Sequence, residues 1–163
     1  MSSEDKITLA DEIKYIRNYV KLQDLRLDHK INLEINVDPK ITQDDVYLPC
    51  MMLQPIVENA IVHGIIPKQD TGEIKIKLAL DNEMLRIIVT DNGIGRKAAA
   101  KQKEGYAKYK SHATQIMRER IDIFNYYNKN KLSFEMIDLY NDDGTPSGTK
   151  AILYAPLDLK TRN

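Results

Sequence analysis

The chain has 163 residues, of which 42% are hydrophobic, and this is enough apolar material for the core of one compact domain. Lysine plus arginine and aspartate plus glutamate number 24 each, so the formal net charge is zero. This balance excludes a global electrostatic attraction to nucleic acid or to an anionic membrane, and we expect no nucleic-acid partner. No apolar run approaches the ~20 residues that a membrane-spanning helix needs, so we expect a soluble chain.

Residues 9–27 predict a first helix. Thr8 followed by Asp11 resembles a capping box. Large apolar residues then recur at helical spacing, at Leu9, Ile13, Ile16, Val20 and Leu27. The same stretch carries polar and aromatic residues that could serve a partner, namely Tyr15, Arg17, Tyr19 and Arg26. We interpret them as residues that solvate the outer edge of the helix.

A strand and a second helix follow. Apolar residues alternate from Ile31 to Val37, which is the pattern of a half-buried strand. A helix should begin close to Leu53, because Pro55 lacks an N–H and fits only the first turn. Gly64 is predicted to end this helix in a left-handed conformation.

The middle of the chain predicts a hairpin and then a loop. Residues 74–80 and 85–89 alternate in polarity around a polar turn, as two antiparallel strands do. The sequence Asp91-Asn92-Gly93-Ile94-Gly95 follows directly. From Arg96 to Lys110 the chain is rich in Lys, Ala and Gln and has few large apolar residues, so we expect a mobile loop with marginal helix.

The last third predicts one more helix and one more hairpin. Helical periodicity returns between Ile116 and Phe124. A strand pattern begins at Leu132 and changes phase between Met136 and Ile137, which predicts a bulge, and residues 150–154 form the final strand. Helices segregated over such strands predict an α+β fold, a two-layer α/β sandwich whose mixed, mostly antiparallel sheet carries helices on one face.

Two polar residues are candidates for nucleotide chemistry. The side-chain carbonyl of Asn59 is a hard oxygen ligand suited to Mg²⁺ that is shared with phosphates. Asp91 could accept a hydrogen bond from an exocyclic amine, while Gly93 and Gly95 would let the backbone approach a ligand closely. Taken singly, each has an ordinary explanation, since helices carry solvated Asn residues and Asp-Asn-Gly makes turns.

The combination is more specific. Residues 53–64 resemble the N box, and residues 91–95 the G1 box, of the gyrase/Hsp90/histidine-kinase/MutL ATP-binding superfamily. The nearest resemblance is to the LytS-type sensor histidine kinases, whose further landmarks match residues 9–27, 117–121 and 147–149. The resemblance implies a Bergerat-type ATP-binding fold. It assigns residues 1–28 to a linker helix that joins an upstream phosphoacceptor region, residues 29–158 to the ATP-binding domain and residues 159–163 to a tail.

The resemblance also implies roles for individual residues. Asn59 would ligand Mg²⁺, and Glu58 and His63 would lie near the phosphates or the metal. Asp91 would bind the adenine amino group, and residues 96–111 would form the ATP lid. The implied ATP-binding residues are Asn59, Asp91, Gly93, Gly95, Lys110, Ser111 and Thr149.

Proline at position 55 distinguishes a kinase from a hydrolase. The ATPases of this superfamily place a catalytic Glu four residues before the metal-binding Asn, and here that position is Pro55. Proline cannot act as a general base. This favours transfer of the γ-phosphoryl group of ATP to a protein nucleophile, where catalysis is mainly positioning and charge neutralisation.

The lid departs from the family pattern. The motif Gly-x-Gly-Leu-x-Asn aligns with residues 111–116, where Ser111, Ala113 and Ile116 replace both glycines and the Asn. The added Cβ atoms would restrict the approach of the backbone to phosphates. The alternative to a kinase is therefore a catalytically silent nucleotide-binding or dimerisation/interaction module with a degenerate ATP lid.

The phosphoacceptor is expected outside this chain. None of His29, His63 and His112 has the sequence context of the family's phosphoacceptor, so we expect no autophosphorylation. The implied partners are a response regulator and the upstream dimerisation/phosphoacceptor region of the same protein, which would be a homodimer. The resemblance implies a cytoplasmic domain whose parent protein lies in the bacterial inner membrane.

Overall fold

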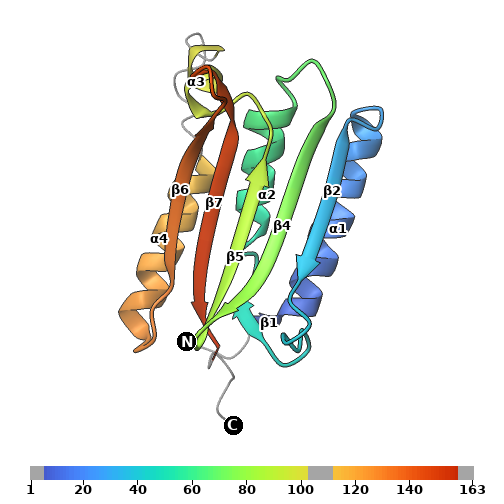
Figure 1. Cartoon of the computed structure of the whole chain (residues 1–163). Helices are drawn as coiled ribbons and strands as arrows, with labels where there is room; N and C mark the ends of the chain where they lie inside the picture. Colours follow the sequence, from blue (N-terminus) through green and yellow to red (C-terminus); the bar gives the residue numbers. More distant parts are fainter. Residues whose placement is uncertain (1–5, 103–111, 158–163) are drawn as a thin grey trace.

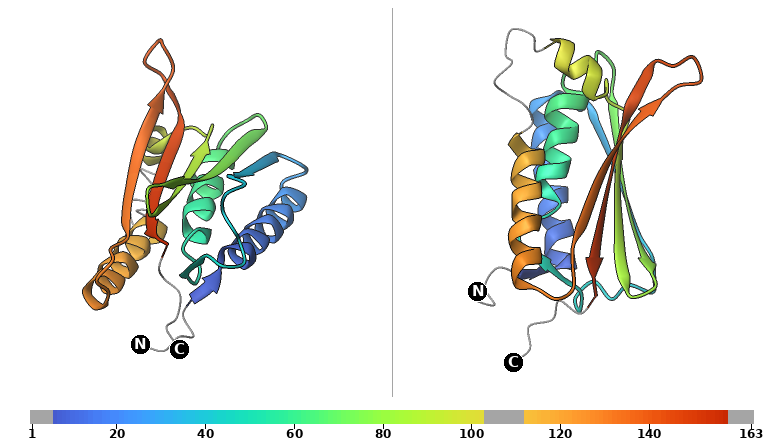
Figure 2. Two further views of the ribbon diagram at one scale, coloured as in Figure 1. Left: turned by 60° about the horizontal axis from the view of Figure 1, so that its bottom comes forward. Right: turned by 90° about the vertical axis from the view of Figure 1, so that its left-hand side faces the viewer.

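The protein is a two-layer sandwich. The computed structural model describes residues 6–102 and 112–157. A sheet forms one layer, and the helices α1, α2 and α4 pack together against one of its faces (Figures 1 and 2). This arrangement confirms the predicted fold class. Within the described residues, no helix has the length and apolar character to cross a lipid bilayer.

The helices are α1 (Leu9–Arg26), α2 (Gln54–Asn59), α3 (Arg96–Gln102) and α4 (His112–Tyr127), and α2 continues without a break into a π-helical segment, η2 (Ala60–Ile65). The strands are β1 (Lys6–Thr8), β2 (Ile31–Val37), β3 (Tyr47–Pro49), β4 (Gly72–Asp81), β5 (Met84–Asp91), β6 (Ser133–Tyr140) and β7 (Pro146–Pro156).

The large sheet has the strand order β2-β4-β5-β7-β6. Strands β2 and β4 run parallel because the chain between them crosses over through α2 and η2, whereas the other neighbours pair antiparallel. The predicted hairpin is confirmed as β4 and β5, which close at Asp81 and Met84. Asn82, in the turn between them, has a φ of 56°, a conformation that Asn tolerates better than most residues.

Alternation along the strands places one side of the sheet in the core. Ile74, Ile76 and Leu78 of β4 lie beside Leu85, Ile87 and Val89 of β5, and all six side chains are buried. The buried side of α1 packs against the same core through Leu9, Ile13, Ile16 and Val20. The predicted first helix is confirmed together with its cap, because the backbone N–H of Asp11 donates to Thr8 Oγ1 at 3.1 Å.

Gly64 does not end the second helix, and that prediction is wrong. Helical structure continues through it to Ile65, and Gly64 lacks a positive φ. A Cβ at this position would lie 2.9 Å from Asp91 Oδ1 and 3.4 Å from Gly93 Cα. Glycine is therefore required here by close packing against the end of β5, a reason that the local sequence does not reveal.

Three other differences concern short or irregular segments. The two-stranded sheet of β1 and β3, which pairs Ile7 with Leu48, was not predicted because three-residue strands carry too little periodicity. The irregularity in the last hairpin exists but lies between Leu139 and Tyr140, not between Met136 and Ile137. Of the predicted mobile loop, residues 96–102 form α3, and residues 103–111 lie outside the described part.

A buried carboxylate on α1 caps the start of α2. Glu12 is 1% exposed, and its Oε1 accepts the backbone N–H of Leu53 at 2.8 Å. Burial raises the pKa of Glu12, while hydrogen bonds from the backbone of Leu53, Met51 and Gln54 act in the opposite direction. On the other side, Arg120 of α4 donates to the carbonyl of Met51 at 2.8 Å and to that of Cys50. The turn before α2 is thus held by both neighbouring helices.

Replacing Glu12 with Ala should destabilise the protein. The substitution leaves buried N–H groups at the start of α2 without an acceptor, which costs about 1–3 kcal/mol of the free energy of unfolding. Glu12→Gln keeps a side-chain oxygen in this place and should cost less. Urea unfolding followed by circular dichroism would measure both variants. An alanine variant as stable as the wild type would show that the cap is not needed.

Candidate nucleotide-binding site

Three backbone segments meet at the end of β5 without intervening side chains. A Cβ added to Gly93 would lie 2.3 Å from Gly64 Cα, and one added to Gly148 would lie 1.9 Å from the carbonyl oxygen of Asp91. The N–H of Ile94 also donates to the carbonyl of Gly64 at 3.1 Å. Larger residues would push η2, the 91–95 loop and β7 apart. The two sequence motifs therefore pack directly against each other.

Asp91 is the buried acceptor at this junction. It is 6% exposed, and its Oδ1 accepts the N–H of Gly93 at 2.9 Å. Burial raises its pKa to about 6, against the opposing effects of backbone hydrogen bonds from Gly93 and Thr149 and of the charge of Lys68. Asp91 forms no salt bridge among the described residues. Burying an unpaired carboxylate costs free energy of folding, and such groups are found most often at functional sites.

Lys68 and Asn92 brace the loop that follows Asp91. Lys68 Nζ donates to the carbonyl of Asn92 at 2.9 Å, and the Asn92 side chain accepts the N–H of Glu73 at 2.7 Å. These bonds tie the loop to the start of β4. Sequence reasoning missed Lys68, because a single lysine in the loop after η2 has no local pattern that reports its position.

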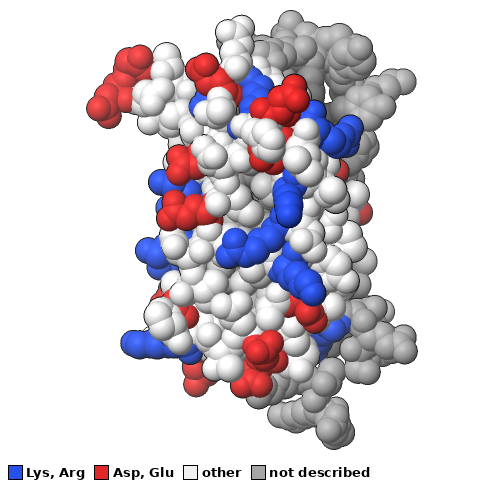
Figure 3. Space-filling view, turned by 90° about the vertical axis from the view of Figure 1, so that its right-hand side faces the viewer, with Lys and Arg blue, Asp and Glu red and all other residues white. Residues whose placement is uncertain are grey.

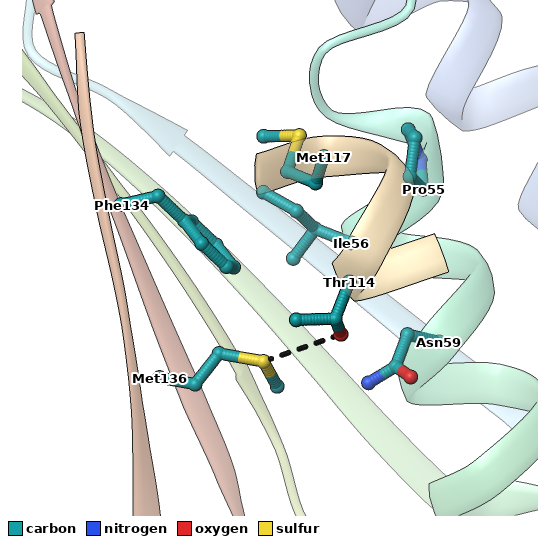
Figure 4. Close-up of a pocket in the computed structure, with 7 residues that line it drawn as sticks. All are labelled: Pro55, Ile56, Asn59, Thr114, Met117, Phe134 and Met136. Atoms are coloured by element: carbon teal, nitrogen blue, oxygen red, sulfur yellow. Dashed lines mark hydrogen bonds between the residues drawn. The ribbon is translucent and has the colours of Figure 1, made fainter. Parts of the chain in front are cut away.

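Asn59 lies at the end of α2, beside the start of α4. It lines a small, mainly apolar pocket together with Pro55, Ile56, Thr114, Met117, Phe134 and Met136. Figure 4 shows the Asn59 amide directed toward the space between Thr114 and Met136, where Thr114 Oγ1 lies 3.6 Å from Met136 Sδ. Among the described residues, none forms a hydrogen bond with this amide.

The remaining predicted site residues divide into three groups. Thr149 pairs with Asp91 across β5 and β7 and is buried, whereas Gly95, with a φ of 84°, leads into α3. Glu58 is exposed on α2, near Tyr19 of α1, and its charge adds to the effect of burial that raises the pKa of Tyr19. His63 is half-buried in η2. Lys110 and Ser111 lie outside the described residues.

The chain is similar in sequence to several sensor kinases. It is 40% identical over 89 residues to an uncharacterized sensor-like histidine kinase of Staphylococcus epidermidis. This match covers 55% of this chain and 17% of that protein. It is 35% identical over 86 residues to the sensor histidine kinase BtsS of Escherichia coli, covering 53% of this chain and 15% of BtsS. It is 38% identical over 98 residues to the sensor protein kinase HptS of Staphylococcus aureus, and this match covers 59% of this chain and 18% of HptS. The matches thus span less than a fifth of these relatives, and no protein family model matches the chain.

Solved structures show the same fold. The catalytic domain of histidine kinase ThkA superposes with a TM-score of 0.61 at 15% identity, covering 93% of this chain and 95% of that domain. The mycobacterial sensor histidine kinase MprB gives 0.60 at 13% identity, with the same coverage of 93% and 95%. A complex of ThkA with the response regulator protein TrrA contains a chain that matches with a TM-score of 0.57 at 18% identity, over 96% of this chain and 42% of that one.

The raised pKa of Asp91 predicts how stability depends on pH. Its carboxyl group has a pKa of about 6 in the folded protein and a reference value of 3.8, so between these values the folded state binds more protons than the unfolded state. The wild type should lose stability as the pH rises from about 4 through 6, by ~3 kcal/mol in total. Asp91→Asn lacks this contribution. Urea unfolding of both proteins over this range would test it, and a pH-independent difference between them would contradict it.

The relatives found by sequence and the neighbours found by fold agree with each other. The relatives detected by sequence are sensor histidine kinases, and the neighbours detected by fold are catalytic domains of such kinases. The resemblance inferred from the two motifs is thereby confirmed. The chain is a homologue of the sensor histidine kinases of two-component signal transduction and has the fold of their ATP-binding catalytic domain.

Proposed function

We propose that this chain binds Mg²⁺-ATP and acts as the catalytic domain of a two-component sensor histidine kinase. The observation that carries the proposal is the buried Asp91, held by direct backbone packing against the helix that bears Asn59. Asn59 and Gly64 are five residues apart, which is roughly 7 Å along a helix axis. A ligand that reaches from Asp91 to Asn59 is therefore elongated, with different chemistry at its two ends.

At the Asp91 end, the ligand would be an adenine ring. An ionised carboxylate accepts hydrogen bonds and does not donate them, so it suits the exocyclic amino group of adenine. Thr149 stands opposite Asp91 in the sheet, and the N–H of Gly93 donates to Asp91 Oδ1 beside it. Asp91, Gly93, Gly95 and Thr149 are proposed as the base-binding residues.

At the Asn59 end, the ligand would be the phosphate chain. Thr114 lies in the first turn of α4, and the start of a 16-residue helix favours anions through its free N–H groups and its dipole. Among the described residues, no cluster of three or more His, Cys, Asp and Glu could hold a metal ion, so most ligands of a Mg²⁺ at Asn59 would come from phosphates and water. Such a metal would neutralise charge on the phosphoryl group.

Further residues are proposed near the phosphates. His63 follows Asn59 by four residues and so lies on a neighbouring part of the same helical surface. Glu58 is proposed from the family motif, although its exposed side chain lies near Tyr19 of α1. Lys110 and Ser111 are proposed from the lid alignment.

The proposed reaction transfers the γ-phosphoryl group of ATP to a histidine outside this chain. Pro55 stands where the hydrolases of the superfamily carry a Glu, so this position offers no base to activate water. The phosphohistidine would then be the donor for a response regulator. The complex of the structural neighbour ThkA with TrrA supports a partner of this kind. The proposed parent protein is a homodimeric sensor of the bacterial inner membrane, and this chain is its cytoplasmic part.

The proposal is tested by calorimetric titration with ATP in the presence of Mg²⁺. Asn59→Ala removes the proposed metal ligand and Asp91→Asn the proposed acceptor, and each should weaken binding about tenfold or more, or about 1.4 kcal/mol. Asn36→Ala and Asp81→Asn are matched controls, because both residues are exposed and pair with Lys77 and Met84, away from the site. They should bind ATP as the wild type does.

The same titration separates the two candidate functions. Unchanged affinity in both site variants would refute the proposed site. If the wild type itself releases no heat at millimolar ATP, the chain is instead the catalytically silent interaction module that the replaced lid residues Ser111, Ala113 and Ile116 suggest.

A further inference from the structure

The outer surface of α1 carries large apolar side chains that the core does not use. Tyr15, Leu22 and Leu25 are 59%, 62% and 55% exposed. The core contacts of this helix come from its opposite side, through residues such as Ile16 and Val20. Single exposed apolar residues are normal on a protein surface, but a row of three along one helix marks an interaction site more often.

These residues follow the spacing of a coiled-coil seam. Tyr15, Asn18, Leu22 and Leu25 are separated by three, four and three residues, which corresponds to heptad positions a, d, a and d. We call these four residues the α1 seam. Two apolar positions per heptad give a narrow stripe along the helix, and coiled coils tolerate a single polar residue within such a stripe at a cost in stability. A helix that lies on a lipid surface presents a broader apolar face. The spacing therefore favours a helical partner over a membrane.

The residues beside the α1 seam are basic. Lys14 and Lys21 flank it on one side and Arg26 on the other, and all three are exposed. From Lys14 to Arg26 the only carboxylate is Asp24, which is half-buried and already accepts the N–H of Ile31 at 2.8 Å. Figure 3 shows Lys and Arg side chains along the middle of the side of the molecule on which α1 and β2 lie. Asp11, three residues before Lys14, is an exposed carboxylate within one turn of that lysine, whereas Lys21 and Arg26 have no exposed carboxylate within one turn on α1.

The charges argue against a second copy of this chain as the occupant. In a parallel pair of α1 helices, position g of one helix faces position e of the next heptad in the other, and this would bring Lys21 against Arg26 of the second copy. An antiparallel pair would bring lysines at position g together. Both arrangements place like charges opposite each other, which is unfavourable. A partner with carboxylates at these positions would form ion pairs instead.

We propose that the α1 seam docks an amphipathic helix of a partner protein, with apolar residues along its own seam and Asp or Glu at the flanking positions. Apolar contact at Tyr15, Leu22 and Leu25 would supply most of the affinity, and Lys14, Lys21 and Arg26 would select an acidic partner. The inference does not depend on nucleotide binding, because none of these residues belongs to the proposed ATP site.

The test uses the whole chain and two synthetic helical peptides, each about four heptads long, with Leu at a and d. One peptide has Glu at positions e and g and the other has Lys there. Fluorescence anisotropy should show binding of the Glu peptide but not of the Lys peptide. Leu22→Asp, and Lys14→Glu combined with Lys21→Glu, should each weaken binding of the Glu peptide about tenfold or more. The double variant should also gain affinity for the Lys peptide.

Matched substitutions elsewhere control for general changes of surface charge and hydrophobicity. Ile123→Asp alters an apolar residue of α4 that is 54% exposed, and Lys129→Glu alters an exposed lysine after α4, so both should leave binding unchanged. Several results would overturn the proposal. In the peptide titration, these are a Glu peptide that does not bind, or control variants that lose as much affinity for it as the seam variants do. The other two are sedimentation of the chain with phosphatidylserine vesicles that only Leu22→Asp abolishes, and a dimer of the chain that Leu22→Asp dissociates.

Discussion

Direct backbone contact of Gly93 with Gly64, and of Gly148 with Asp91 and Asn92, is the constraint on which the candidate site depends. A side chain at Gly93 or Gly148 would overlap the neighbouring backbone, since the added Cβ would approach within 2.3 Å and 1.9 Å of its neighbours. The contact fixes the distance between the helix that bears Asn59 and the strand that ends at Asp91. It also buries Asp91, and burial is the largest cause of its raised pKa. The close backbone contacts at these glycines therefore account both for the packing of the site and for the raised pKa of Asp91.

Hydrogen bonds from two neighbouring helices hold the start of α2, at the opposite end from Gly64. Glu12 of α1 accepts the N–H of Leu53, and Arg120 of α4 donates to the carbonyls of Cys50 and Met51. The turn before α2 is thus joined to both neighbouring helices by hydrogen bonds, and those from the Arg120 guanidinium are stronger than bonds between neutral groups. A displacement of α1 or α4 would reach α2 through this turn. The α1 seam begins three residues after Glu12, so an occupant of the seam would touch the helix that supplies the cap.

Several features could be predicted from the sequence because they rest on local patterns. Alternation identified β4 and β5, helical spacing and Thr8 identified α1, and Pro55 placed the start of α2. Asp91 and Asn59 were recognised from residue chemistry and motif spacing, and the resemblance to sensor histidine kinases was confirmed by the relatives. Gly64 was misread because a glycine near the end of a helical pattern usually marks a cap, and here the requirement comes from Asp91 and Gly93, 27 and 29 residues later. Lys68 was missed for a similar reason.

The sequence by itself determined the order of the longer helices and strands, the buried side of each one and the two motifs that carry the resemblance to sensor histidine kinases. These follow from residue periodicity and from side-chain chemistry within short windows. Only the tertiary structure decided that Glu12 caps α2, that Gly64 packs against Gly93 and that one row of apolar residues on α1 stays outside the core. Each of these depends on which distant segments meet in space, and the pattern of a single helix or strand carries no information about its neighbours.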